Sequence, residues 1–308
     1  MPARQTPMTR GSVRFVLLVV FILMVVVAAC GDDDGTAEAE TTAPSSDVGE
    51  TGVVEVRRTP GIDYTGTGSF RRMDIWAPTA PGEWPSVVVV PGVGQQSKAS
   101  FQPLAQTIAE QGAVVFVIDI DDSVPFITAI QQAACAVRYA DAHTAEYGGD
   151  PGNIVIVGNS MGASVASVVA LAGDSFPGPC AVEGGSAHVE AFVGFEGAYD
   201  YVRESDYLMV DHRYLEDEDP ELYAAIDPYT HLDDNPDLAV RLIHGVDDDV
   251  LWYDVPPGES VAFGEALSEH GCPCDVTLLE GSAAVDLMRA DSEAFDAVVE
   301  ATMEVAAA

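Results

Sequence analysis

The chain has 308 residues, with 13 lysines and arginines against 50 acidic residues and a formal net charge of −37 at pH 7. This balance excludes nucleic acid as a partner, because phosphate binding needs clustered cations. The apolar fraction of 48% and the length predict one globular domain with a sizeable core, together with a short segment outside it.

The N-terminal residues have the pattern of an export signal. Three arginines precede an apolar run of 15 residues, 15–29, and no acidic residue occurs before Cys30. The run is shorter than the roughly 20 residues of a membrane-spanning helix. Basic, apolar and small residues in this order are typical of a secretory signal. The sequence Val27-Ala28-Ala29-Cys30 resembles a bacterial lipoprotein box, which implies cleavage before Cys30 and a lipid on its sulfur.

An uncleaved short anchor is the alternative. Both interpretations predict an extracytoplasmic protein held at the cell membrane. Residues 30–51 are acidic, poor in apolar residues and without periodicity, so they cannot offset their ordering entropy. We therefore expect a signal peptide over 1–29, a lipidated cysteine with a disordered tether over 30–51, and a folded domain over 52–308.

Short apolar runs alternate with helical patterns along the domain. The runs predict strands over 53–57, 70–76, 86–90, 113–118, 153–157, 190–195, 239–243 and 275–279, and the helical spacing predicts helices over 101–111, 127–146, 162–171, 260–270 and 292–304. Buried β-branched strands that alternate with helices indicate an α/β fold, with a mostly parallel sheet covered on both faces.

Residues 199–236 interrupt this alternation and are rich in tyrosine, aspartate and proline. We expect an insertion over the C-terminal edge of the sheet, where open α/β sheets bind their ligands. Tyr199, Tyr201 and Tyr207 are the aromatic residues predicted to form walls of the pocket.

The strongest motif is Gly158-Asn159-Ser160-Met161-Gly162, which matches G-x-S-x-G. It follows a predicted strand and opens a predicted helix, and this is the context that a nucleophile elbow requires. The tight turn presents the Ser160 hydroxyl above the sheet. The Met161 N–H, at the start of the helix, then points at a developing oxyanion. The alternative is a strand-to-helix turn without chemistry.

Several segments in the same order as the motif carry a resemblance to a known superfamily. They are Asp-Ile-Trp-Ala-Pro at 74–78, Trp-Pro-Ser-Val-Val-Val at 84–89, Cys-Ala-Val-Arg-Tyr at 135–139, Tyr-Gly-Gly-Asp-Pro at 147–151 and Ile-His-Gly at 243–245. With the elbow, they make residues 53–305 resemble the α/β-hydrolase superfamily, and most of all bacterial carboxylesterases of the dienelactone-hydrolase and feruloyl-esterase kind. The resemblance implies the α/β-hydrolase fold, a small ester or acyl ligand, and no cofactor.

The resemblance also assigns roles to two further segments. Pro-Gly-Val-Gly-Gln at 91–95 occupies the place of the second oxyanion donor, so Val93 or Gly94 is expected to supply that N–H. Asp248 occupies the place of the acid that orients a catalytic histidine. Its acidic neighbours, Asp247 and Asp249, leave two alternatives open, which are a solvated loop and a cation site.

The catalytic base is missing from its expected place. The superfamily pattern has a histidine after the last strand, and the matching sequence here, Glu-Gly-Ser-Ala-Ala-Val-Asp-Leu at 280–287, has Ala284 in that position. Without a base, Ser160 is a weak neutral nucleophile. His212 and His231 lie in the 199–236 insertion and are the candidate substitutes.

The chain has five cysteines. With Cys30 assigned to lipid, the other four permit two disulfides in an oxidising compartment, and Cys135–Cys180 is one candidate pair because both flank the nucleophile region. Four cysteines allow three pairings, and buried free thiols are an equal alternative.

Two functions remain in competition. The first is a serine esterase that acts on small extracellular esters, with Ser160 as nucleophile and a relocated histidine. The second is a pseudoenzyme that has kept the pocket and serves as a binding protein at the cell surface. A cation-binding role for Asp247, Asp248 and Asp249 is a third hypothesis with no further support, and the sequence has no metal-binding motif such as H-E-x-x-H.

Overall fold

The computed structural model describes residues 54–68, 72–92, 97–120, 124–200, 219–246, 255–282 and 284–308. The predicted signal, Cys30 and the acidic tether lie outside these residues, and so do Val93, Gly94, His212 and Asp248. The described residues belong to one unit, Glu50–Ala308. Among them, no helix has the length and apolar character needed to cross a bilayer.

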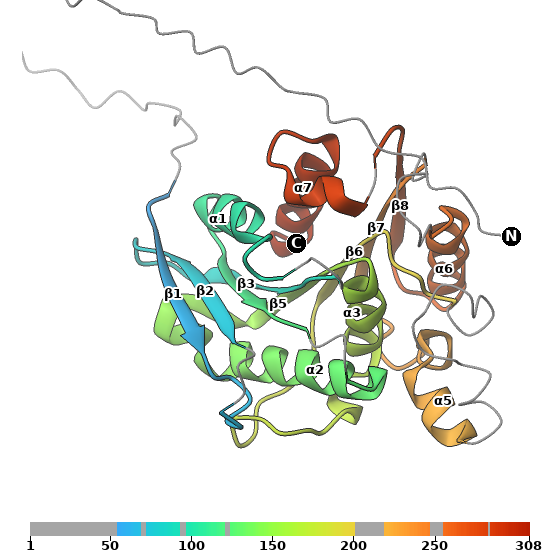
Figure 1. Cartoon of the computed structure of the whole chain (residues 1–308), viewed down its shortest axis with the longest axis horizontal. Helices are drawn as coiled ribbons and strands as arrows, with labels where there is room; N and C mark the ends of the chain where they lie inside the picture. The colour runs from blue at the N-terminus through green and yellow to red at the C-terminus, as the bar shows by residue number, and fades with distance from the viewer. Residues whose placement is uncertain are drawn as a thin grey trace, which may run out of the picture. The chain divides into compact units, whose positions relative to one another are not determined.

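Eight strands form a single sheet in the order β1-β2-β4-β3-β5-β6-β7-β8 (Figure 1). β2 runs antiparallel to both of its neighbours, and every other pair in the sheet is parallel. The predicted mostly parallel sheet is therefore confirmed. The strands are β1 (Val56–Ile62), β2 (Met73–Pro78), β3 (Trp84–Val90), β4 (Val114–Ile118), β5 (Gly149–Asn159), β6 (Ala191–Phe195), β7 (Ala239–Gly245) and β8 (Cys274–Leu279).

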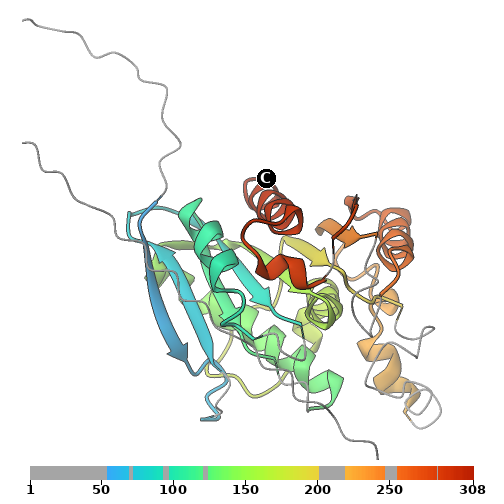
Figure 2. The same cartoon turned by 45° about the horizontal axis from the view of Figure 1, so that its top comes forward.

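Helices cover both faces of the sheet, as predicted. α1 (Gln102–Glu110) and α7 (Glu293–Ala306) lie on one side, and α2 (Phe126–His143) and α3 (Met161–Ala172) lie on the other (Figure 1 and Figure 2). α6 (Gly258–Glu269) packs on the same side as α2 and α3. Shorter elements are α5 (Pro220–Ile226), η1 (Thr144–Tyr147), η2 (Gly173–Ser175), η3 (Pro228–Thr230) and η4 (Ala284–Met288).

The core consists of two layers that share the central strands. In β3, Val88 and Val90 belong to the layer beneath α2 and α3, whereas Val87 and Val89 belong to the layer beneath α1 and α7. Successive side chains of a strand point to opposite faces, so a run of four valines supplies both layers. This explains why the central strands are continuous apolar runs rather than alternating ones.

Strand β5 is longer than the sequence predicts. The prediction begins it at Asn153, because Asp150, Pro151 and Gly152 are turn formers. In the structure it begins at Gly149, which pairs with Trp84 before the register shifts between Trp84 and Ser86. Tertiary pairing with β3 thus overrides the local turn propensity.

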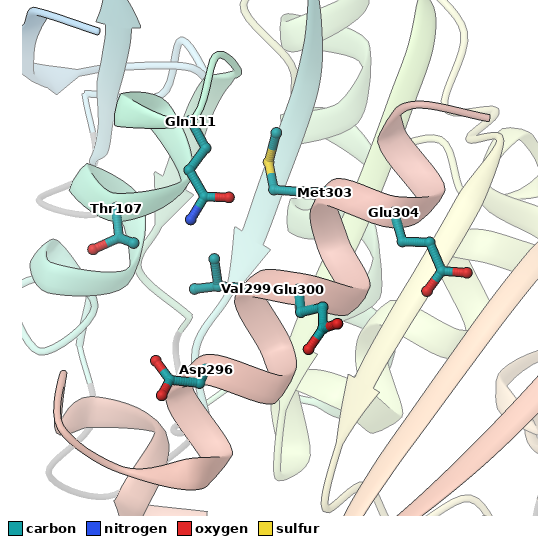
Figure 3. Close-up of a pocket in the computed structure, with 7 residues that line it drawn as sticks. All are labelled: Thr107, Gln111, Asp296, Val299, Glu300, Met303 and Glu304. Carbon is teal, nitrogen blue, oxygen red and sulfur yellow. The ribbon is translucent and has the colours of Figure 1, made fainter. Parts of the chain in front are cut away.

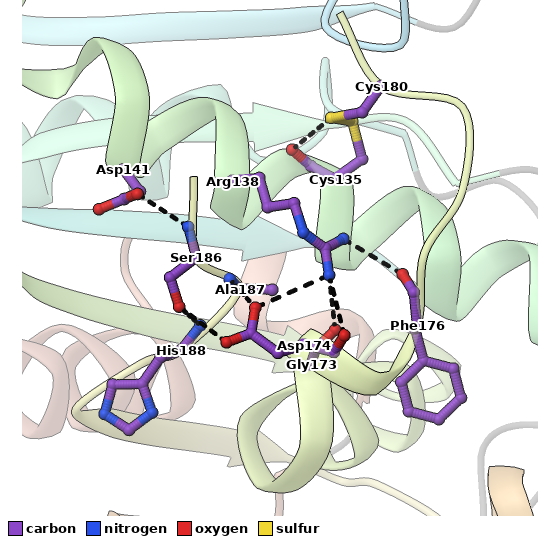
Figure 4. Close-up of polar contacts among 10 residues, drawn as sticks. All are labelled: Cys135, Arg138, Asp141, Gly173, Asp174, Phe176, Cys180, Ser186, Ala187 and His188. Carbon is purple, nitrogen blue, oxygen red and sulfur yellow. Dashed lines mark hydrogen bonds and ion pairs between the residues drawn. A yellow bond between two sulfur atoms is a disulfide. The ribbon is translucent and has the colours of Figure 1, made fainter. Parts of the chain in front are cut away.

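The Cys135–Cys180 disulfide ties α2 to the segment that follows α3 (Figure 4). It was one of the pairings that the sequence allowed. A closed loop with a sequence separation of 45 restricts the unfolded chain, which stabilises the fold by about 2–4 kcal/mol. Cys272 and Cys274 are free thiols, and burial raises the pKa of Cys274 to about 12, so this thiol stays protonated at neutral pH.

Arg138 and Asp174 fix the same segment to α2 (Figure 4). The Arg138 guanidinium donates to the carbonyl oxygens of Gly173 and Phe176, each at 3.1 Å. The Asp174 carboxylate accepts from the Ala187 N–H at 2.7 Å. Together with the disulfide, these bonds fix the segment that follows α3, and hence the end of the helix opposite to Ser160.

Candidate active site

Ser160 occupies a sharp turn between β5 and α3. Its φ of 53° and ψ of −127° lie in a region that L-residues rarely adopt. The Ser160 N–H donates to the Phe195 carbonyl of β6 at 2.8 Å, and the Ser160 carbonyl accepts from the Ala163 N–H at 2.8 Å. The side chain is partly exposed. The backbone therefore has the geometry of a nucleophile elbow, which presents a hydroxyl above the sheet.

The two glycines of the motif are required by packing rather than by their own dihedral angles. A Cβ at Gly158 would overlap the Ala163 Cα. A Cβ at Gly162 would overlap the Val90 and Pro91 carbonyl oxygens at the end of β3. All these atoms belong to the main chain, so no rotamer change relieves the overlap. The start of α3 is thus in direct contact with the end of β3.

This contact bears on Met161, one of the expected oxyanion donors. Met161 is the first residue of α3, and the first N–H groups of a helix have no partner inside it. The segment that carries Val93 and Gly94 starts where β3 contacts Gly162, and its structure lies outside the described residues. The donor role of Met161 therefore fits the geometry, whereas those of Val93 and Gly94 stay predictions.

Lys98, the only lysine of the chain, anchors the far end of that segment. Its backbone N–H and its Nζ donate to the two carboxylate oxygens of Asp119, at 3.0 and 2.7 Å. Nζ also lies 3.8 Å from an oxygen of Asp74, whose buried carboxylate pairs with Arg58 at 2.6 Å. Of these groups the Asp74 carboxylate is the buried one, so removal of its partners would leave a buried charge unpaired, which is costly.

The C-terminal ends of β6, β7 and β8 converge on the other side of the elbow. The Gly245 N–H at the end of β7 donates to Oε1 of Glu196, which directly follows β6, at 3.1 Å. A Cβ at Gly245 would overlap the carbonyl oxygen of Ser282, three residues beyond β8. Ala284 then opens η4. The structure therefore places Ala284, where the superfamily pattern predicts a histidine, at the same sheet edge as Ser160. Asp248 comes three residues after Gly245 in the sequence and lies outside the described residues.

His231 does not reach Ser160, contrary to its proposed role as a substitute base. Its ring nitrogens bond with the Asp234 carboxylate at 2.8 Å and the Ala225 carbonyl at 2.9 Å, and its ring packs edge-on against Phe176. Phe176 lies just beyond the C-terminal end of α3, and Ser160 lies before its N-terminal end. A 12-residue helix is about 18 Å long, so the two residues are separated by the length of α3.

The remaining described histidines lie away from Ser160 or bond with other groups. His188 precedes β6 and His270 precedes β8, which places both at the opposite edge of the sheet from Ser160. His143 ends α2 and bonds with Glu146. The buried ring of His244 lies between the Ser260 hydroxyl and the Val255 carbonyl, each at 2.8 Å. Within the described part of the chain, no histidine is hydrogen-bonded to Ser160.

Tyr199 is a core residue and not a wall of the pocket, which corrects the expectation from its sequence position. Its side chain is buried and stacks on Phe263 of α6, with ring centroids 4.5 Å apart. Burial raises the pKa of its hydroxyl well above the ordinary value. The Glu259 carboxylate accepts from the N–H groups of Tyr199 and Asp200 and so fixes the chain after β6 to α6. Tyr201 and Tyr207 lie outside the described residues.

Three hollows lined by described residues lie away from Ser160. The one in Figure 3 has a volume of about 480 Å³ and separates Thr107 of α1 and Gln111, which follows that helix, from the face of α7 that carries Val299 and Met303. The others lie beside β1 and against α6. Among the described residues, no group of histidine, cysteine and acidic side chains is arranged to hold a metal ion. The serine elbow is thus the arrangement with recognisable chemistry.

A comparison with protein families agrees with this geometry. The BD-FAE family model, which describes esterase-like α/β hydrolases, matches residues 73–267. The chain belongs to the BD-FAE family. The match extends from β2 to α6 and includes Ser160, whereas Ala284 lies beyond its end.

Named relatives of this BD-FAE protein are esterases. A probable isoprenylcysteine alpha-carbonyl methylesterase, ICMEL1, from Arabidopsis thaliana is 27% identical over 243 residues, which cover 71% of this chain and 49% of the relative. Esterase LipQ from Mycobacterium tuberculosis is 28% identical over 237 residues, covering 70% and 53%. The chain thus spans about half the length of the curated relatives that it matches.

Solved structures show the same fold. The butyrate-bound Est2 esterase from Thermogutta terrifontis superposes with a TM-score of 0.65 at 24% identity, covering 83% of this chain and 94% of that structure. A truncated carbohydrate esterase from gut microbiota also gives a TM-score of 0.65, at 18% identity, and covers 86% and 99%. The predicted α/β-hydrolase fold is therefore confirmed.

The contact between Gly162 and β3 can be tested by substitution. Gly162→Ala should lower the free energy of unfolding by about 1–3 kcal/mol, because its Cβ meets main-chain oxygens that cannot move aside. Gly258→Ala is the matched control, since this glycine opens α6 and has no atom within 4 Å of an added Cβ. Urea unfolding of both variants measures the difference. Equal midpoints would contradict the packing argument.

Proposed function

We propose that this BD-FAE protein hydrolyses carboxylic esters through Ser160. The strained elbow at Ser160 is the observation that carries the proposal, because such a conformation persists only where the surrounding structure enforces it. Family membership and the esterase names of the relatives support the same reaction class.

The proposed reaction uses the elbow in two steps. The Ser160 hydroxyl attacks the ester carbonyl carbon, and the Met161 N–H, together with an N–H of Val93 or Gly94, stabilises the oxyanion. The alcohol leaves with the proton from Ser160, and an acyl-serine remains. Water then releases the carboxylic acid and regenerates the serine. Asp248 supports the group that moves the proton.

A second function is compatible with the same site, because Ala284 occupies the position of the expected catalytic histidine. An alanine cannot accept a proton, and loss of one triad member typically lowers kcat by about 10⁴–10⁶-fold while leaving some oxyanion-hole catalysis. The alternative is therefore a pseudoenzyme that binds an acyl ligand at the cell surface. His212, which lies outside the described residues, is the substitute base that remains under the first proposal.

We also propose that the domain is exported and anchored to the membrane by lipid on Cys30. The basic start, the apolar run and the small residues before Cys30 support this proposal. The Cys135–Cys180 disulfide is compatible with an oxidising compartment. Cys30→Ala should move the protein from the membrane fraction to the soluble one, which membrane fractionation with detection by antibody measures. Unchanged membrane retention would instead favour an uncleaved apolar anchor.

The first test of the enzyme proposal is the hydrolysis of a short-chain activated ester. The protein should hydrolyse it much faster than Ser160→Ala, whose rate should fall by orders of magnitude because the nucleophile is gone. His212→Ala should give the same loss if His212 is the base. Equal, near-background rates for the protein and Ser160→Ala would support the pseudoenzyme.

A second test restores the missing base. Ala284→His should raise kcat/KM for the same ester by orders of magnitude, because an imidazole at this position completes the triad. Ala283→His is the matched control, since it adds the same side chain one residue out of register. An equal rate for both variants and the unmodified protein would show that the acid or the oxyanion hole is also displaced.

A further inference from the structure

The two edges of the sheet differ in how they are protected. β1 and β8 are the outermost strands, and each has one side without a strand partner among the described residues (Figure 1). Proteins protect such edges with prolines, bulges and charged side chains, because free N–H and C=O groups recruit other strands. β1 has all three features, namely Pro60, a register shift between Thr59 and Ile62, and the side chains of Arg57 and Arg58.

β8 lacks comparable protection. Its six residues include no proline or glycine, and they pair with β7 in one unbroken register. Its one charged residue, Asp275, forms an ion pair with Arg241 of β7 at 3.2 Å. β8 therefore presents an unbroken row of backbone groups with which another strand can pair.

Alternate residues of β8 turn their backbone groups outward. The carbonyls of Pro273 and Leu279 accept hydrogen bonds from N–H groups at either end of β7. In a parallel pair the bonds to one neighbour come from every second residue, so the odd-numbered positions face β7. The N–H and C=O groups that point away from the sheet are therefore those of Cys274, Val276 and Leu278.

An exposed apolar side chain and a hollow lie along this edge. Among the described residues, Leu278 is the one large apolar side chain that is exposed, at 47%. It points to the α6 side, because Cys274 and Val276 pack there and successive side chains alternate between the two faces. On that side a hollow of about 570 Å³ lies between β8 and α6, and its lining includes Cys274, Val276, Val261, Gly264 and Ser268.

We propose that β8 is a dimerisation edge, which pairs antiparallel with β8 of a second copy of this chain about a two-fold axis at Val276. In this register Val276 lies opposite its own copy, and Leu278 lies opposite Cys274 of the second copy. Every outward-facing residue then has a partner, and each pair exchanges two hydrogen bonds, about six in total. An axis at Thr277 would instead pair Cys274 with Glu280, which lies outside the strand.

The same register suits the side chains. Leu278 of each copy enters the hollow of the other, because Cys274, which it lies opposite, lines that hollow. The exposed leucine is thereby removed from water. On the other face Asp275 lies opposite Thr277, so no two acidic side chains of the strands face each other. One chain thus supplies both the leucine and its recess, as an isologous two-fold contact requires.

The first test compares two lysine variants of the full chain. Leu278→Lys removes the side chain that enters the hollow and should raise the dimer dissociation constant at least about tenfold. Thr277→Lys adds the same charge at an exposed position, but opposite Asp275 of the second copy, and should leave the dimer as tight or tighter. Sedimentation equilibrium in a non-ionic detergent measures both, in roughly 0.5 M salt to screen the repulsion between two acidic copies.

A protein that stays monomeric at about 100 μM would overturn the inference. Equal weakening by the two lysines would overturn it as well, because the contact would then not follow the register. A dimer that Leu278→Lys leaves unchanged would place the contact on another surface, such as the apolar N-terminal run that all variants share. Should Leu278→Lys fail to fold, cross-linking decides.

Cross-linking tests the register in membranes of cells that produce the full chain. Val276→Cys places its two Cα atoms about 5.5 Å apart, within the range of a disulfide. Asp275→Cys is the matched control, because it is more exposed but its two copies are roughly 8 Å apart. Both variants carry Cys274→Ser, so that the neighbouring thiol cannot divert the bond.

Oxidised glutathione serves as the oxidant and takes up the hydrogens of the two thiols as the disulfide forms. A larger fraction of disulfide-linked dimer for Val276→Cys than for the more exposed Asp275→Cys would support the inference. Equal fractions, a larger fraction for Asp275→Cys, or no cross-linked dimer at all would overturn it.

Discussion

The contact between the start of α3 and the end of β3 is the constraint on which the site depends. The backbone of Gly162 packs against the backbone carbonyls of Val90 and Pro91, and no space is left for a side chain. This approach joins the helix that opens at Met161 to the strand that leads into the second oxyanion segment. The start of α3 at Met161 therefore depends on an interface made of backbone atoms, which repacking of side chains cannot adjust.

Two other groups of contacts support the elbow from either side. On one side, Lys98 ties the chain after β3 to Asp119 and the buried Asp74. On the other, Glu196 joins the ends of β6 and β7. Charged groups thus hold the chain at the carboxyl ends of several strands, where the sheet itself offers no further hydrogen-bond partners. A precise site needs such support, because catalysis is sensitive to displacements of about 1 Å.

Much of this arrangement was predictable from the sequence, for identifiable reasons. The buried strands and the elbow are local patterns, since apolar runs set the strands and G-x-S-x-G sets the turn. The sequence could not show that the candidate base His231 lies far from Ser160, because this distance depends on how residues 219–238 pack at the far end of α3. Tyr199 was misplaced for a similar reason, as its burial depends on α6, about 60 residues later in the chain.

Glu196 escaped prediction although it left a trace in the sequence, an acidic residue directly after a buried strand. In so acidic a chain, one more carboxylate gives no signal until the sheet order places β6 beside the nucleophile strand. Lys98 is the opposite case. The sequence shows that Lys98 is the only lysine of the chain. Its partners, Asp74 in β2 and Asp119 directly after β4, can be identified only once the pairing of these two strands is known.

The ion pairs of Lys98 and Arg58 also bear on the conditions that suit this protein. With a net charge of −37, most carboxylates of the chain have no cation of their own, and their mutual repulsion opposes the compact state. Added salt screens that repulsion over a Debye length of roughly 10 Å at 0.1 M, but acts far less on partly buried pairs. Dissolved cations thereby reduce the repulsion between carboxylates, as basic side chains do in most proteins. The folded state is therefore expected to become more stable as the salt concentration rises.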